Sequence, residues 1–129
     1  HCLTMDWSAT ILELGGAAPD AQHPWDGVSL ASFLRDPSQT FERPMFWRMS
    51  HRGQRAMRLG PWKYLRVDGH DYLFNIHADA RERANLAQRE PQRLAQMRQA
   101  WESWESSMPP IPSDAAVNLG YSYKDMPQR

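Results

Sequence analysis

Four short segments with the composition and alternation of β-strands follow one another in the middle of the chain. They are residues 45–49, 54–59, 62–67 and 72–76. His51-Arg52-Gly53 and Gly60-Pro61 separate the first three. Asp68-Gly69, before the last, is a strong hairpin signal because a type I′ turn needs positive φ at both central positions. Consecutive strands with such short links pair most simply with their neighbours. The sequence therefore predicts a four-stranded antiparallel meander.

Alternation within a strand predicts which side chains share a face of that sheet. The groups expected on one face are Met45, Trp47 and Met49 in the first segment and Tyr72, Phe74 and Ile76 in the last. We also expect Trp62 and Tyr72 to belong to the packed face of the sheet.

An amphipathic helix is predicted after the strands. Glu90-Pro91 marks its start, since proline at the first helical position loses no needed hydrogen bond, and Pro109-Pro110 stops it. Apolar residues recur at steps of three and four, namely Leu94, Met97, Trp101, Trp104 and Met108. This stripe should pack on one face of the meander. The expected fold class is therefore α+β, with the sheet and its C-terminal helix forming a subdomain over residues 45–108.

Residues 1–44 are predicted to be a short helix and a long connection. Asp6 is the expected N-cap, Trp7, Ile11 and Leu14 fall on one face, and Gly15-Gly16 is a stop signal. A possible helical turn follows at residues 29–34. So short a helix is marginal alone, and so long an irregular stretch is unusual in a compact domain. We therefore expect this region to dock on something larger or, with its apolar side chains exposed, to self-associate. Residues 109–129 show no periodicity and are expected to be an irregular tail.

Composition excludes some classes of protein. The chain has 15 basic and 15 acidic residues, which argues against a nucleic-acid binder. It has no apolar run of about 18 residues, so no membrane span is expected. Cys2 is the only cysteine, which precludes an internal disulfide and leaves the compartment open between cytoplasm and periplasm. Because it begins at His1 rather than methionine, we expect the chain to be part of a longer polypeptide.

Five short motifs occur in an order that covers nearly all of residues 4–108. They are the helix at residues 4–15, Asp26-Gly27-Val28-Ser29-Leu30, Arg58-x-Gly60-x-Trp62-Lys63-Tyr64, Tyr72-Leu73-Phe74-Asn75-Ile76 and Asp79-x-x-Glu82-x-x-Asn85-Leu86-Ala87. In this order they resemble the C-terminal part of the sulfatase family, within the alkaline-phosphatase-like superfamily. Ala9 and Ala80 stand where that family usually has proline. Asn75 replaces its usual aspartate, which should remove a capping carboxylate.

The resemblance implies a catalytic apparatus that these residues do not contain. Sulfatases use a formylglycine made from the first residue of a Cys/Ser-x-Pro-x-Arg motif, and a calcium or magnesium ion held by Asp and Asn side chains earlier in the chain. Cys2 is followed by Leu-Thr-Met, so it is not that nucleophile. The aspartates Asp20, Asp26, Asp36 and Asp79 are too scattered to offer convergent ligands. We therefore expect no catalytic residue, metal site or cofactor in this chain, and a missing N-terminal catalytic domain as its partner, on which residues 1–44 would dock.

Substrate-rim candidates lie where the first strand ends. Arg48, His51 and Arg52 form a basic cluster suited to an anion such as a sulfate, which a rim arginine could hold through paired donors. The alternative interpretation is an ordinary solvated turn. Four further basic residues on the second and third strands are expected to face solvent and pair with nearby acids. They are Arg55, Arg58, Lys63 and Arg66.

Two other functions stay open at this point. The chain could be an autonomous module that binds anionic or sulfated ligands, for which only the basic cluster argues. It could also be the C-terminal part of a phosphonate monoester hydrolase of the same superfamily, which shares the late motifs. The sequence does not name a substrate.

Overall fold

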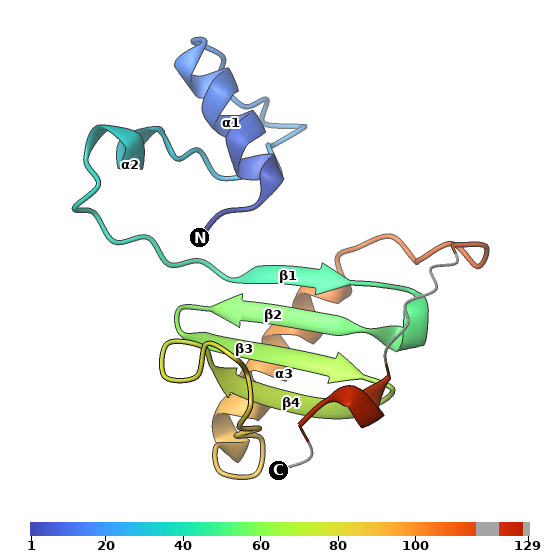
Figure 1. Ribbon diagram of the computed structural model, residues 1–129. Coiled ribbons are helices and arrows are strands. Elements are labelled where there is room, and N and C mark those ends of the chain that lie inside the picture. Colours follow the sequence, from blue (N-terminus) through green and yellow to red (C-terminus); the bar gives the residue numbers. More distant parts are fainter. Residues whose placement is uncertain (116–121, 128–129) are drawn as a thin grey trace. The chain divides into compact units, whose positions relative to one another are not determined.

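The computed structural model describes residues 1–115 and 122–127, and the chain divides into two compact units, His1–Phe41 and Glu42–Arg129. The first unit contains α1 (Thr4–Leu14) and α2 (Ala31–Arg35). The second contains β1 (Met45–Arg48), η1 (His51–Gly53), β2 (Arg55–Leu59), β3 (Trp62–Val67), β4 (His70–Asn75), α3 (Pro91–Glu105) and η2 (Tyr123–Asp125). Figure 1 shows the four strands as one sheet with α3 across one of its faces. The predicted α+β class is confirmed.

The sheet is an antiparallel meander with the order β1-β2-β3-β4. Phe46, Met57, Tyr64 and Leu73 pair in turn and form one row across all four strands. Asp68 and Gly69 have φ values of 50° and 81°, as the predicted type I′ turn requires. Local turn chemistry and strand alternation are therefore sufficient to explain this topology.

The main core lies between this row and α3. Met97 and Trp101, from the predicted apolar stripe, pack on Met57, Tyr64 and Leu73, and all five side chains are buried. The helix ends at Glu105, four residues before the first proline of the Pro109-Pro110 pair, so Met108 lies beyond it. Pro91 at the first helical position is confirmed as the helix start.

The opposite face of the sheet carries a second core of Val67, Tyr72 and Phe74. The C-terminal tail covers it with Tyr123 and Met126. The expectation that Trp62 and Tyr72 share one packed face is wrong. In the β3–β4 register Trp62 pairs with Asn75 and Tyr72 with Leu65, which puts the two rings on opposite faces.

The segment that leads into α3 closes the edge of the sheet at β4. The Asn85 Oδ1 atom accepts hydrogen bonds from the backbone N–H groups of Leu73 and Ala87, each at 3.0 Å, and the Leu86 N–H donates to the Leu73 carbonyl at 2.8 Å. Asn75 Oδ1 accepts from two backbone N–H groups that follow it, each at 3.2 Å. The Asn75 amide oxygen therefore accepts the backbone hydrogen bonds at the position where the loss of a capping carboxylate was expected.

In the first unit, the predicted role of Asp6 needs correction. Leu3 is the N-cap of α1, and Asp6 is the third helical residue. Its carboxylate accepts from the Leu3 N–H at 2.6 Å and from the Val28 N–H at 2.9 Å. The bond from Val28 joins α1 to the Asp26-Gly27 turn. Asp6 is therefore buried by a segment that is distant in sequence, which supplies a hydrogen-bond donor for its carboxylate.

The apolar face predicted for α1 is exposed rather than packed within the unit. Trp7 is 47%, Ile11 67% and Leu14 56% exposed. The buried face instead consists of Asp6, Ala9 and Thr10.

Candidate functional site

The structure brings two of the three rim candidates together in the η1 turn. The Arg52 Nε atom donates to His51 Nε2 at 3.0 Å, and Arg52 Nη1 lies 3.0 Å from Asp68 Oδ2. Arg52 has a φ of 53°, a left-handed conformation that costs free energy in any residue but glycine. The ion pair to Asp68 therefore holds the strained residue in one place.

Asp68 also connects this turn to the tail. Its Oδ2 atom accepts from the Tyr123 N–H at 3.2 Å. Burial acts to raise the pKa of Asp68, but the hydrogen bonds from Tyr123 and Arg52 outweigh it, so the pKa lies below its ordinary value. The carboxylate is consequently ionised at neutral pH and can compensate the Arg52 charge.

Arg48, the third candidate, is engaged elsewhere. Its Nη1 atom lies 3.0 Å from Glu105 Oε1, and its Nη2 donates to the Pro109 carbonyl at 2.7 Å. These contacts tie β1 to the end of α3. The sequence places Glu105 near the end of the predicted helix, off its apolar stripe, but does not indicate that Glu105 pairs with Arg48.

A hollow of about 460 Å³ lies beside His51. It is lined by Met49, Ser50, His51, Gly53, Ile111, Pro112, Ser113 and Ala115. None of these described lining residues is acidic, so the His51 imidazole meets no carboxylate among them. The Arg52 guanidinium is next to this wall in sequence but is not part of the lining, and its Nη1 is paired with Asp68. This arrangement suits a small anion.

The expectation that the other basic side chains of the sheet pair with nearby acids is confirmed for Lys63 and for Arg66, which lies 3.8 Å from Asp71, whereas Arg55 instead stacks on an aromatic ring. The Arg55 guanidinium lies 4.6 Å from the centroid of the Trp101 ring on the α3 face. Lys63, on the opposite face, pairs with both carboxylate oxygens of Glu82 at 2.7 and 2.8 Å. These contacts explain the basic residues as structural, and they leave the η1 turn as the better candidate for an anion.

Buried Tyr64 and half-buried Asp71 form a polar pair that is unsuited to proton transfer near neutral pH. The Tyr64 hydroxyl donates to Asp71 Oδ1 at 3.0 Å. Burial and the adjacent Asp71 charge raise the pKa of Tyr64 to about 12. The phenol therefore stays protonated and acts as a structural donor.

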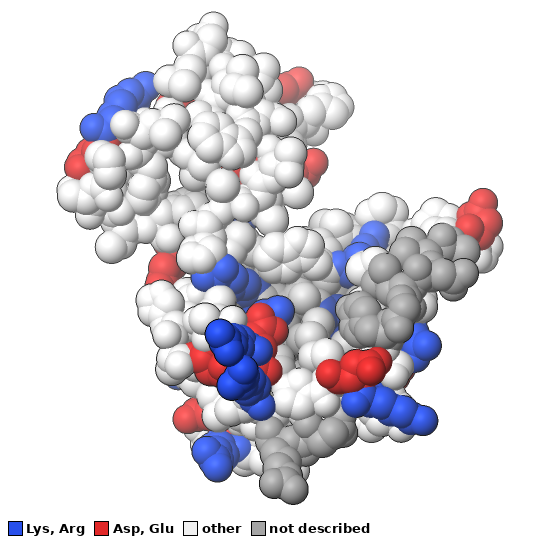
Figure 2. Space-filling view, viewed as in Figure 1, with Lys and Arg blue, Asp and Glu red and all other residues white. Residues whose placement is uncertain are grey.

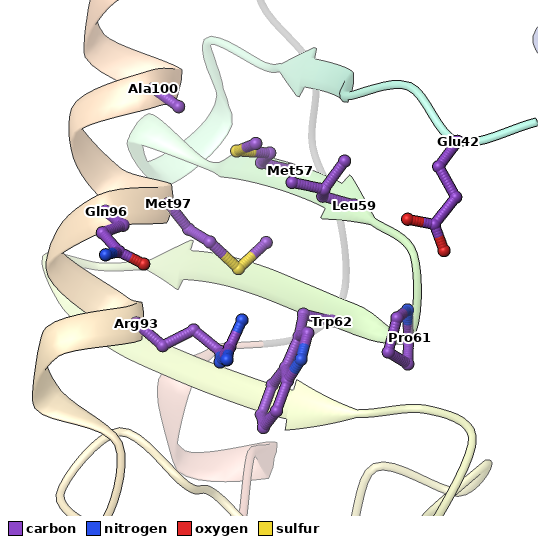
Figure 3. A pocket seen from close by; sticks show the side chains of 9 residues that line it. All are labelled: Glu42, Met57, Leu59, Pro61, Trp62, Arg93, Gln96, Met97 and Ala100. Carbon is purple, nitrogen blue, oxygen red and sulfur yellow. The ribbon is translucent and has the colours of Figure 1, made fainter.

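A second concave feature, a groove between α3 and the β2–β3 hairpin, was not predicted from the sequence. Its volume is about 460 Å³. Figure 3 shows Met57 and Met97 in its floor, with Arg93 reaching from α3 toward Trp62. The Arg93 guanidinium lies 4.4 Å from the Trp62 ring centroid.

The residues that the structure describes do not fit a formylglycine or a catalytic cation. Cys2 is exposed and lies outside any Cys-x-Pro-x-Arg sequence. Within residues 1–115 and 122–127, no three His, Cys, Asp or Glu side chains gather as metal ligands would. We therefore derive no catalytic step from this chain.

Comparison with solved structures finds the same fold in parts of much longer chains. A Bacteroides thetaiotaomicron protein from work on the metabolism of multiple glycosaminoglycans (BT33336S-sulf) matches with a TM-score of 0.67 and 19% identity, over 78% of this chain and 24% of that one. Ps i-CgsB matches with a TM-score of 0.63 and 24% identity, over 77% of this chain and 23% of its own. A 2-O GAG sulfatase matches with a TM-score of 0.61 and 24% identity, over 78% and 24%.

This chain thus spans about a quarter of the length of the solved structures it matches. Comparisons with protein-family models and with curated proteins gave no match. The likeness establishes the fold. Of the described helices, none is long and apolar enough to cross a membrane.

Proposed function

We propose that this chain is the C-terminal part of a sulfatase, a sulfuric ester hydrolase, and that it has no catalysis of its own. The observation that carries the proposal is the match of its fold to about a quarter of each of several longer chains, one of them a 2-O GAG sulfatase. The ordered motifs support it independently, because they are found in the sequence without reference to the fold.

The contacts made by the motif residues support a structural role. Asp6 joins α1 to the Asp26-Gly27 turn, Lys63 pairs with Glu82, and Asn85 caps the edge of β4. Each contact bridges elements that are far apart in the chain, so the motifs serve the stability of the fold.

The His1–Phe41 unit is the part that would dock on the missing catalytic domain. In Figure 2 this unit displays few charged side chains. Its sequence has six, namely Asp6, Glu13, Asp20, Asp26, Arg35 and Asp36. Exposed Trp7, Ile11 and Leu14 on a surface of so little charge favour burial against a partner.

Within the complete enzyme, we assign His51 and Arg52 to the substrate rim. They lie together in a strained turn, where His51 lines a hollow whose described residues include no acid and Arg52 is held by Asp68, whereas Arg48 pairs with Glu105 at the end of α3. Because neither residue is a nucleophile or metal ligand, Arg52→Ala and His51→Ala should raise KM several-fold to tens of fold and leave kcat nearly unchanged. Arg89→Ala, in an exposed position before α3, is the matched control. A wild-type KM in both rim variants would return the turn to a structural role.

The coding sequence upstream of His1 tests the main proposal. We expect it to encode a Cys/Ser-x-Pro-x-Arg segment, and the full-length protein to release sulfate from an aryl sulfate or a sulfated saccharide, measured by ion chromatography. The 129-residue chain alone should release none. Absence of the segment, or turnover by the short chain that a substitution within it abolishes, would refute the proposal. Hydrolysis of a phenylphosphonate ester without sulfate release would instead assign the parent to the phosphonate monoester hydrolases.

The alternative of an autonomous anion-binding module is favoured only by the pairing of His51 with Arg52 beside the hollow. It requires the isolated chain to bind a sulfated disaccharide with an affinity that Arg52→Ala reduces. Calorimetry on the 129-residue chain separates this module from a rim that works only within a complete enzyme.

A further inference from the structure

The groove between α3 and the β2–β3 hairpin has the size and lining of a small-molecule site. Its volume of about 460 Å³ lies within the range of roughly 300–1,000 Å³ found for ligand pockets. Apolar side chains from both elements line it, namely Met57, Leu59, Pro61, Trp62, Met97 and Ala100. Figure 3 shows Arg93 and Gln96 on α3 at one side of these side chains and Glu42 at the other.

Arg93 places a positive charge at one edge of this groove. Its guanidinium lies 4.4 Å from the Trp62 centroid, and no carboxylate of the described residues forms an ion pair with it. The ring face attracts the cation and restricts its position but uses none of its N–H donors in a charge-assisted bond. Stacking thus pre-organises an arginine whose donors stay available for a ligand.

Glu42 places the opposite charge at the other end. Its carboxylate lies against Gly60, where a Cβ atom would come within 2.8 Å of Oε1. A ligand in the groove therefore meets a cation at one end and an anion at the other. This polarity favours a single negative group beside Arg93 and disfavours a second one near Glu42.

We propose that this groove binds a small aromatic monoanion, such as an aryl carboxylate or sulfonate. Its ring system lies against Leu59, Pro61 and Trp62, the more exposed apolar side chains of the groove, with the buried thioethers of Met57 and Met97 beneath them. The anionic group accepts from Arg93, and the Gln96 amide supplies a further donor at the same edge. The site differs from the η1 rim, whose hollow shares no lining residue with it, and does not rest on the proposed sulfatase function.

The test uses the 129-residue chain and two matched probes, naphthalene-2-sulfonate and its neutral isostere naphthalene-2-sulfonamide. Binding is measured by calorimetry and located by ¹H–¹⁵N shift changes. We expect saturable binding of the sulfonate, with shifts at Met57, Trp62 and Met97. Arg93→Gln should weaken it about five- to thirtyfold, the effect of losing a charge-assisted contact in a partly open site, whereas Arg89→Gln should not.

A second variant keeps the test decisive if Arg93→Gln perturbs the stacked Trp62. Leu59 is 39% exposed at the groove, so Leu59→Glu adds a negative charge with little cost to the fold and should also weaken binding of the sulfonate. The sulfonamide should bind weakly and respond little to Arg93→Gln. No saturable binding, equal binding by wild type and both variants, or shifts confined to His51–Gly53 would each overturn the proposal.

Discussion

Replacing Trp101 with alanine should destabilise the Glu42–Arg129 unit more than an alanine at any other position of α3. Trp101 is 2% exposed in the centre of the core. Its Nε1–H donates to the Trp47 carbonyl at 3.0 Å, and the Arg55 guanidinium stacks on its ring at 4.6 Å. The side chain therefore joins α3 to β1 and β2 at once.

The magnitude follows from these contacts. Removing a buried tryptophan typically costs about 3–5 kcal/mol, because a cavity stays where the ring was. The Trp47 carbonyl would also lose its donor, at a cost of about 1–3 kcal/mol if no water replaces it. These terms overlap, so we expect about 4–5 kcal/mol for Trp101→Ala. At about 4–8 °C per kcal/mol for a domain of this size, Tm should fall by roughly 20 °C or more.

Urea unfolding followed by far-UV circular dichroism measures this loss without depending on tryptophan emission. Trp104→Ala is the matched control, since Trp104 is half-buried and stacks on Phe46 at 5.1 Å, and it should cost about 2 kcal/mol. Trp101→Phe keeps the six-membered ring but removes both the Nε1–H donor and the buried pyrrole atoms, so it should cost less than Trp101→Ala. An unchanged midpoint for Trp101→Ala, or a loss no larger than that of Trp104→Ala, would refute the core derived for α3.

Three further substitutions test other parts of the fold. Gly27→Ala would put a Cβ atom into the Met5 carbonyl, so amide exchange in α1 should accelerate strongly; unchanged protection would contradict this packing. Asn85→Ala removes the acceptor for the Leu73 N–H and should cost about 1–3 kcal/mol in urea unfolding, and a loss below 0.5 kcal/mol would be inconsistent with it. The backbone N–H of Ala84 is the largest of the influences that lower the pKa of Asp79. Ionised Asp79 therefore stabilises the fold above about pH 4, and this contribution is lost as the pH falls through the lowered pKa. The difference in unfolding free energy between wild type and Asp79→Ala should accordingly become smaller below about pH 4. A gap independent of pH would contradict the role of that charge.

Local sequence chemistry predicts most of the secondary structure. Asp68-Gly69 marks a type I′ hairpin because few other dipeptides tolerate positive φ twice in succession. Pro91 marks the first turn of α3, and the spacing of Met97 and Trp101 marks its buried face. Each of these features depends on neighbours within a few residues, which is why the sequence is enough to find them.

Local sequence patterns did not predict which face of the sheet packs against α3. Alternation defines which residues share a face, but both faces of this sheet carry aromatic rings, so it does not say which face receives α3. The register puts Trp62 under the helix and Tyr72 under the tail, where Tyr123 covers it. Only the packing of two distant segments decides this.

The candidate sites show the same division. The sequence alone placed His51 and Arg52 side by side in a turn and excluded a nucleophile at Cys2. The tertiary structure decided that Arg48 pairs with Glu105, 57 positions away, and that Arg93 stacks on Trp62 beside an open groove. The physical reason is that an ion pair or a stacked ring depends on distance in space. Composition and local periodicity report only which partners exist, and the fold selects the ones that meet.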